Sequence, residues 1–151
     1  MGHVLEQDKI ESYCVAGKAT VTIANEKRGT SFTFQVMAPK KKTPKGGVKV
    51  DYDANVRFVS LLTGSNNESG YTYLGTLHRQ QDGSWLYRHG AKSPIGKDAR
   101  GAKAFAWTWE NLGQLPPALV VRHSGKCGRC KRKLTTVESL NSGIGPECAK
   151  K

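Results

Sequence analysis

Apolar and polar residues alternate along two neighbouring stretches near the start of the chain, a pattern typical of β-strands with one buried face. In residues 19–24, Ala19, Val21 and Ile23 alternate with threonine and alanine, and residues 31–36 alternate in the same way. The segment between them is rich in the residues that form turns. We therefore expect a β-hairpin. Three further stretches predict an antiparallel meander: residues 56–62, 71–77 and 84–88.

After Pro94 the spacing of the apolar residues changes to that of an amphipathic helix. The residues that recur at this spacing are Ala102, Phe105, Ala106, Trp109 and Leu112. Gly113 stands where glycine often ends a helix, and two prolines follow it. The pattern predicts one main helix packed on the sheet, with a last strand over residues 118–122.

These elements predict an α+β fold, in which an antiparallel β-sheet is packed by one main helix. We expect a loose N-terminal arm or a short helical lead-in over residues 1–13, a body of sheet and helix over residues 14–117, and a C-terminal module over residues 118–151. Residues 38–47 hold four lysines, two prolines and two glycines but no large apolar residue, which favours a mobile basic loop.

Charge changes the picture, because 24 Lys and Arg face only 12 Asp and Glu, a net charge of +12. Residues 112–137 hold six basic residues and no acid. A nucleic acid is the natural partner of such a chain, although membrane surfaces and acidic proteins also attract basic ones. No apolar run approaches the ~20 residues of a membrane span, and the N-terminus lacks the features of a signal peptide. We expect no membrane partner and a cytoplasmic location.

Three cysteines gather near the C-terminus, in the order His123-x3-Cys127-x2-Cys130-x17-Cys148. Cys-x2-Cys on a tight turn is typical of tetrahedral zinc sites, and a disulfide is disfavoured in the cytosol. We therefore expect one structural Zn²⁺ held by His123, Cys127, Cys130 and Cys148, so that the α+β fold carries a C-terminal zinc-knuckle module over residues 118–151. The alternatives for the fourth ligand are Cys14 and an open position. The alternative for the cluster as a whole is a set of reduced cysteines in a basic tail.

The same tail resembles a small zinc-knuckle domain of unknown function that occurs largely in bacteriophage proteins. The matching features are His123, the Cys-Gly-Arg-Cys turn, Leu134-Thr135, Glu138-Ser139 and the Gly-Ile-Gly-Pro-x-Cys run that ends at Cys148. Lys131 departs from the pattern, where the family more often has Gly. Residues 58–73 resemble the preceding region of such phage proteins more weakly. The resemblance implies zinc and a phage setting, with the cytoplasm of a bacterial host as the location, but no reaction.

Three groups of residues are candidates for contact with nucleic acid. The first is the cationic cluster around the Cys-x2-Cys turn, whose side chains we expect to radiate outward to phosphates. The second is the lysine run of the basic loop, for which the alternative is simple solvation. The third is an aromatic strand face on which bases could stack, for which the alternative is packing in the sheet. The candidates are Arg122, Lys126, Arg129, Lys131, Arg132 and Lys133; Lys40, Lys41 and Lys42; and Trp85, Tyr87 and Arg88.

The leading hypothesis is a non-catalytic, zinc-containing basic protein of phage type that binds nucleic acid, DNA or RNA, through phosphate contacts. The alternative is a protein-binding factor that docks on a host enzyme or defence complex and inhibits or redirects it. A metal-dependent nuclease is disfavoured, because the ligand set leaves zinc no vacant position and no carboxylate cluster is visible. Among His78, Asp82 and His89, no spacing matches a catalytic arrangement.

Overall fold

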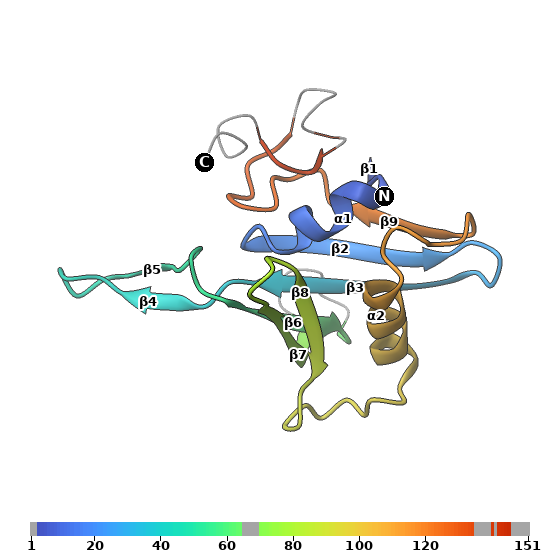
Figure 1. The fold of residues 1–151 in the computed structure, drawn as a ribbon, viewed down its shortest axis with the longest axis horizontal. Helices are drawn as coiled ribbons and strands as arrows, with labels where there is room; N and C mark the ends of the chain where they lie inside the picture. The colour runs from blue at the N-terminus through green and yellow to red at the C-terminus, as the bar shows by residue number, and fades with distance from the viewer. Residues whose placement is uncertain (1–2, 65–69, 135–139, 141, 146–151) are drawn as a thin grey trace.

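The computed structural model describes residues 3–64, 70–134, 140 and 142–145. In this part of the chain, seven strands form one sheet in which every neighbouring pair is antiparallel (Figure 1). The α+β class with a large antiparallel sheet is confirmed. In spatial order the strands are β1 (His3–Val4), β9 (Leu119–His123), β2 (Lys18–Asn25), β3 (Thr30–Met37), β6 (Val56–Leu62), β7 (Tyr71–Arg79) and β8 (Trp85–His89).

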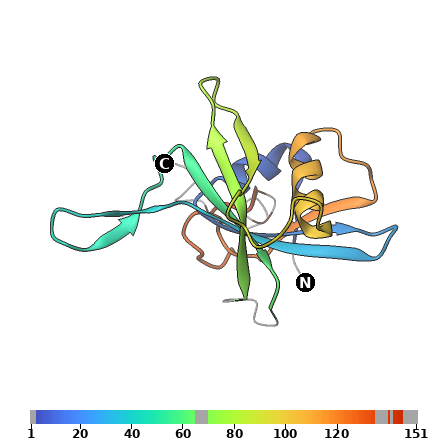
Figure 2. The same ribbon diagram turned by 90° about the horizontal axis from the view of Figure 1, so that it is seen from below.

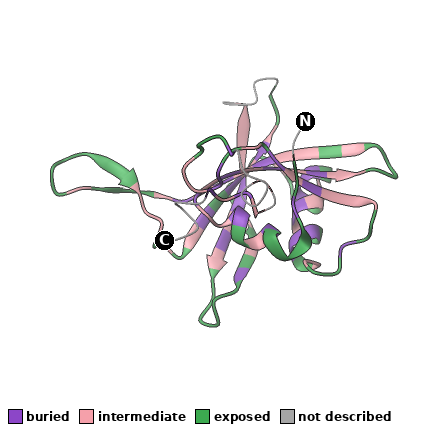
Figure 3. Ribbon diagram, turned by 90° about the horizontal axis from the view of Figure 1, so that it is seen from above, coloured by how far each residue is buried: buried purple, intermediate pink, exposed green. Residues whose placement is uncertain are grey.

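The predicted hairpin and meander are confirmed as β2–β3 and β6–β7–β8. Ala19, Val21 and Ile23 are buried, as their alternation predicts. The hairpin turn is fixed by Asn25, whose Oδ1 accepts the backbone N–H groups of Lys27 and Arg28, both at 3.1 Å. The sheet therefore forms where the local pattern places it, and its buried face supplies the core (Figure 3).

Two helices, α1 (Gln7–Cys14) and α2 (Arg100–Glu110), contribute to this core (Figure 2). Helix α2 is the main helix that the sequence predicts. Its Phe105 ring lies 5.1 Å from the ring of Phe34 and 5.0 Å from that of Tyr87, measured between centroids. Trp109 Nε1 donates a hydrogen bond to the backbone oxygen of Trp85 at 2.8 Å. The helix is thereby tied to both the centre and the β8 edge of the sheet.

Of the two alternatives for the N-terminal residues, the described part of the chain has the short helix and not the loose arm. Strand β1 pairs with β9, and the N–H of Leu5 donates to the oxygen of Val121 at 2.8 Å. In α1, Ile10, Tyr13 and Cys14 are buried. These three residues have the i, i+3, i+4 spacing of a helix with one apolar face, in a helix of only eight residues.

The expected mobile loop contains β4 (Lys40–Lys42), which pairs with β5 (Val48–Val50) just after the loop to form a second, two-stranded sheet that projects from the body (Figure 1). The turn between the strands is held by Thr43, whose Oγ1 accepts the N–H of Gly47 at 3.0 Å. Backbone pairing makes this hairpin, and the three lysines of β4 are exposed. The lack of large apolar residues does not prevent strand formation here.

The last predicted strand is β9, and it lies inside the main sheet between β1 and β2 rather than in a separate module. The chain after β9 also packs on the body. The N–H of Lys18 donates to the oxygen of Gly128 at 2.6 Å. A Cβ atom on Gly128 would lie 2.8 Å from the ring of Tyr13, so the glycine backbone rests directly on that ring. The described part of the tail is therefore joined to α1 and β2.

Candidate metal-binding turn and nucleic-acid interface

The Cys-x2-Cys segment forms a tight turn closed by the backbone. The N–H of Cys127 donates to the oxygen of Arg132, and the N–H of Lys131 donates to the oxygen of Cys127, both at 2.8 Å. Lys131 has φ of +64°, in the left-handed region that glycine adopts most easily. This conformation explains why glycine suits the position and shows that a lysine there carries a local backbone cost.

Backbone N–H groups surround the sulfur of Cys127. Its Sγ accepts the N–H of Gly145 at 3.2 Å and that of Arg129 at 3.4 Å. Burial raises the pKa of this thiol, but hydrogen bonds from Gly145, Arg129 and Cys130 outweigh burial and lower the pKa to about 7. Such donors stabilise a thiolate, the form in which cysteine binds metals. Cys127 and Cys130 thus fit the first half of a zinc site.

Cys148, the third predicted thiol ligand, lies outside the described residues. Gly145 belongs to the part of the chain that the structure describes, and its N–H donates a hydrogen bond to the sulfur of Cys127. Cys148 follows Gly145 by three positions in the sequence.

His123 is buried at the end of β9, and both of its ring nitrogens have partners. Nε2 lies 2.6 Å from the oxygen of Leu140, and Nδ1 accepts the N–H of Gly125 at 3.0 Å. Since a carbonyl can only accept, Nε2 carries the proton. Among the residues that the structure describes, no three His, Cys, Asp or Glu side chains come together, so His123 does not join Cys127 and Cys130.

Cys14, the alternative ligand, is in the core at the end of α1. Burial, with a smaller contribution from Glu11, raises the pKa of its thiol to about 12. A thiol in such a place stays protonated and inert. This environment is the opposite of the one around Cys127.

A cleft brings the lysine run and the Cys-x2-Cys turn together, although some 80 residues separate them in the sequence. We call it the basic cleft, and its volume is about 630 Å³. Five cations and one carboxylate line it. The lining residues are Lys18, Lys40, Lys41, Lys49 and Arg129, with Val48, Val50, Tyr52 and Asp53.

Tyr52 joins the two walls of the basic cleft. Its hydroxyl donates to the backbone oxygen of Arg129 at 2.8 Å, and the Arg129 guanidinium lies 3.9 Å from the centre of its ring. Lys41, on the opposite wall, forms an ion pair of 3.7 Å with Asp51. The cationic groups are therefore held on ordered backbone, which reduces the entropy that they lose on binding.

Arg57 holds the backbone at Tyr52 through a hydrogen bond. The sequence analysis named neither residue as a candidate. The Arg57 side chain is 2% exposed and donates four hydrogen bonds of 2.9 Å to backbone oxygens. One of these oxygens belongs to Tyr52. The sequence did hold a sign of the role of Arg57, because this residue falls on the same face of β6 as the buried Val59 and Leu61. A charged residue at a core position needs several partners, and here the loop backbone supplies them.

The aromatic strand face is packed rather than available to bases. Trp85 is 7% exposed, and the guanidinium groups of Arg57 and Arg79 lie over its ring, at 5.0 and 4.9 Å from the ring centre. Tyr87 packs on Phe105. Only Arg88 of this predicted group is exposed. The structure thus agrees with the packing alternative for the two aromatic residues.

The remaining predicted cations are spread around the turn. Lys126, Lys131, Arg132 and Lys133 are exposed on it, and Lys42 is exposed on β4. Arg122 lies on β9, where it pairs with Glu26 at 3.7 Å. The basic cleft therefore contains Lys40, Lys41 and Arg129 of the predicted set, while these others lie outside its lining.

Residues 117–151 match the model of a family of unknown function, DUF6011. No curated protein and no solved structure matches the chain. Within the described ranges, neither helix has the length and apolar character that crossing a membrane would require.

Proposed function

We propose that this protein binds nucleic acid, without catalysis, through phosphate contacts in the basic cleft. The observation that carries the proposal is the convergence of Lys40, Lys41 and Arg129 on one cleft from two distant segments. Phosphates along a strand are spaced a few ångströms apart, and several cations on a fixed surface can contact them together. Contacts of this kind carry little sequence information, so we expect affinity to depend weakly on base sequence.

Zinc has a structural role in this proposal. Cys127 and Cys130 would hold it, and Cys148 is the third proposed ligand. The thiolate-stabilising N–H groups around Cys127 support this assignment. For His123 to supply the fourth ligand, as the spacing predicts, its ring would have to release the N–H of Gly125 and free Nδ1. The metal would fix the turn that carries Arg129, and so one wall of the basic cleft.

The experiment is a salt titration of binding, measured by fluorescence anisotropy with labelled single- and double-stranded oligonucleotides of two unrelated sequences. The cleft variant combines Lys40→Ala, Lys41→Ala and Arg129→Ala. The control variant combines Lys9→Ala, Lys92→Ala and Lys97→Ala, which removes the same charge from exposed positions outside the cleft.

In the wild type we expect the logarithm of affinity to fall linearly with the logarithm of salt concentration, alike for both sequences. The cleft variant removes three cations and should therefore reduce the magnitude of this slope by about 2 to 3 units, because each lost phosphate contact reduces it by about 0.7 to 0.9. The control variant should keep the wild-type slope. Equal slopes in the cleft variant and the wild type would overturn the proposal. Stoichiometric capture of a protein partner by nuclease-treated wild type, with no oligonucleotide binding, would instead favour the protein-docking alternative.

A further inference from the structure

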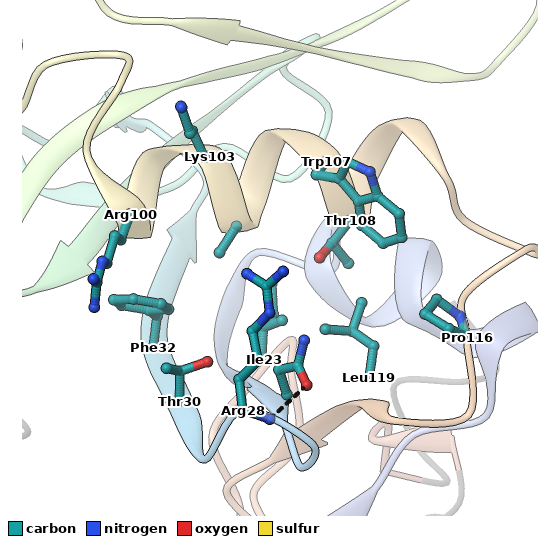
Figure 4. Close-up of a pocket in the computed structure, with 12 residues that line it drawn as sticks. Ile23, Arg28, Thr30, Phe32, Arg100, Lys103, Trp107, Thr108, Pro116 and Leu119 are labelled. Atoms are coloured by element: carbon teal, nitrogen blue, oxygen red, sulfur yellow. Dashed lines mark hydrogen bonds between the residues drawn. The ribbon is translucent and has the colours of Figure 1, made fainter.

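A second cleft lies on another part of the molecule, between α2, the β2–β3 hairpin and the start of β9 (Figure 4). We call it the α2 cleft, and its volume is about 780 Å³, within the range of small-molecule sites. It shares no residue with the basic cleft. Its lining residues are Ile23, Asn25, Arg28, Thr30, Phe32, Arg100, Lys103, Ala104, Trp107, Thr108, Pro116 and Leu119.

The charge of the α2 cleft is entirely positive. Three cations line it, Arg28, Arg100 and Lys103, and no carboxylate is among the lining residues. Arg28 reaches across the middle of the cleft toward α2, and Arg100 stands at the end near Phe32 (Figure 4). Glu26, in the same hairpin turn as Arg28, is engaged by Arg122 at 3.7 Å. An anion entering this cleft therefore meets cations from two elements and no opposing charge.

The rest of the α2 cleft is apolar, with an indole on its wall. Ile23, Phe32 and Leu119 form apolar surface beneath Arg28, and Trp107 lies at the opposite end from Arg100 (Figure 4). The Trp107 side chain is 47% exposed, whereas Phe105 and Trp109 of the same helix are buried. Core packing thus uses the neighbouring aromatic residues of α2 and leaves the Trp107 ring open to a planar ligand.

We propose that the α2 cleft binds a nucleoside phosphate, with the base on the apolar surface beside Trp107 and the phosphate at Arg28 and Arg100. Because Trp107 lies at the end of the cleft away from Arg100, the cleft favours a ligand that has a planar end and an anionic end. A free nucleotide and one unit of a single strand both have this chemistry. The proposal does not rest on the function proposed for the basic cleft.

The test is a titration of the full-length protein with AMP, ATP, a thymidine hexanucleotide and tripolyphosphate, followed by tryptophan fluorescence and by calorimetry. The charge variant is Arg28→Glu with Arg100→Glu, and its control is Lys92→Glu with Lys97→Glu, two exposed lysines outside both clefts. The stacking variant is Trp107→Ala, and its control is Trp107→Phe, which keeps an aromatic face. Circular dichroism checks that each variant is folded.

We expect ATP to bind and to quench the fluorescence of Trp107. Arg28→Glu with Arg100→Glu should weaken binding at least tenfold, and its control less than twofold. Trp107→Ala should weaken binding about fivefold or more, the cost of losing one base–aromatic stack, while Trp107→Phe should weaken it less. Competition by the hexanucleotide would identify a strand unit as the ligand, and binding of ATP alone would identify a free nucleotide.

Equal affinity for tripolyphosphate and ATP would overturn the proposal, because the base would then contribute nothing. So would equal losses in the charge variant and its control, or binding of none of the nucleotides. The function proposed for the basic cleft is separable from these outcomes. Its own variant, with Lys40, Lys41 and Arg129 replaced, should bind ATP like the wild type.

Discussion

Arg57→Met should strongly destabilise the fold, because it removes all the hydrogen bonds of a buried guanidinium while keeping most of the volume of its side chain. Four backbone oxygens lose a donor at 2.9 Å, those of Val15, Tyr52, Ala54 and Val56. At about 1.5 kcal/mol for each charge-assisted bond, the loss is about 6 kcal/mol. Release of the buried charge offsets part of this loss, so the free energy of unfolding should fall by about 3–5 kcal/mol.

The measurement is urea unfolding of the wild type and of Arg57→Met, monitored by circular dichroism. The control is Arg79→Met, which removes the other guanidinium stacked on Trp85 but from an exposed position. Losing that exposed cation–π contact should cost about 0.5–1 kcal/mol. If Arg57→Met costs no more than Arg79→Met, the hydrogen bonds of Arg57 do not hold the loop at Tyr52, and our account of the cleft wall is refuted.

Elemental analysis should find one zinc per chain in the wild type and in Cys14→Ser, but none in Cys127→Ser; zinc retained in Cys127→Ser would exclude this ligand. With a pKa of about 12, the Cys14 thiol should react with a thiol reagent at pH 8 more than a hundredfold more slowly in the folded protein than in urea. Because the folded state holds this proton more tightly, stability should also fall as pH rises above 9. Gly143→Ala should cost about 2 kcal/mol or more in urea unfolding, because φ is +76° and the new Cβ would meet the ring of Tyr13. Gly113→Ala, with φ of +88° and open space, is its control, and equal costs would mean that the tail does not rest on Tyr13.

Strands and the main helix could be predicted because their patterns are local. The alternation in β2 and β3 and the helical spacing around Phe105 each report a buried face within about ten residues. Helix α1 could be predicted only as an alternative to a loose arm, because eight residues show little more than two turns of a helical period. The β4–β5 hairpin escaped it because backbone pairing, with no buried apolar face, forms these strands.

The candidate site was only partly predictable, since it depends on contacts between distant segments. From spacing alone, Cys127 and the cations near it could be named as candidates, but spacing did not predict that Arg129 lies beside Lys40 and Lys41. That placement depends on Tyr52, which contacts a residue 77 positions away. Spacing also favoured His123 as a ligand, whereas β9 buries its ring and the backbone engages both nitrogens. A residue near the cysteines in sequence need not face them.

The most direct test of the proposed function is to locate bound nucleic acid on the chain by hydrogen exchange. Amide exchange of the full-length protein would be measured by mass spectrometry with and without a single-stranded oligonucleotide, at a salt concentration where binding is complete. We predict slower exchange in two segments at once, residues 40–52 and residues 126–133, because these segments carry the lining residues Lys40, Lys41 and Arg129 of the basic cleft. Binding that leaves exchange in both segments unchanged would contradict the proposal.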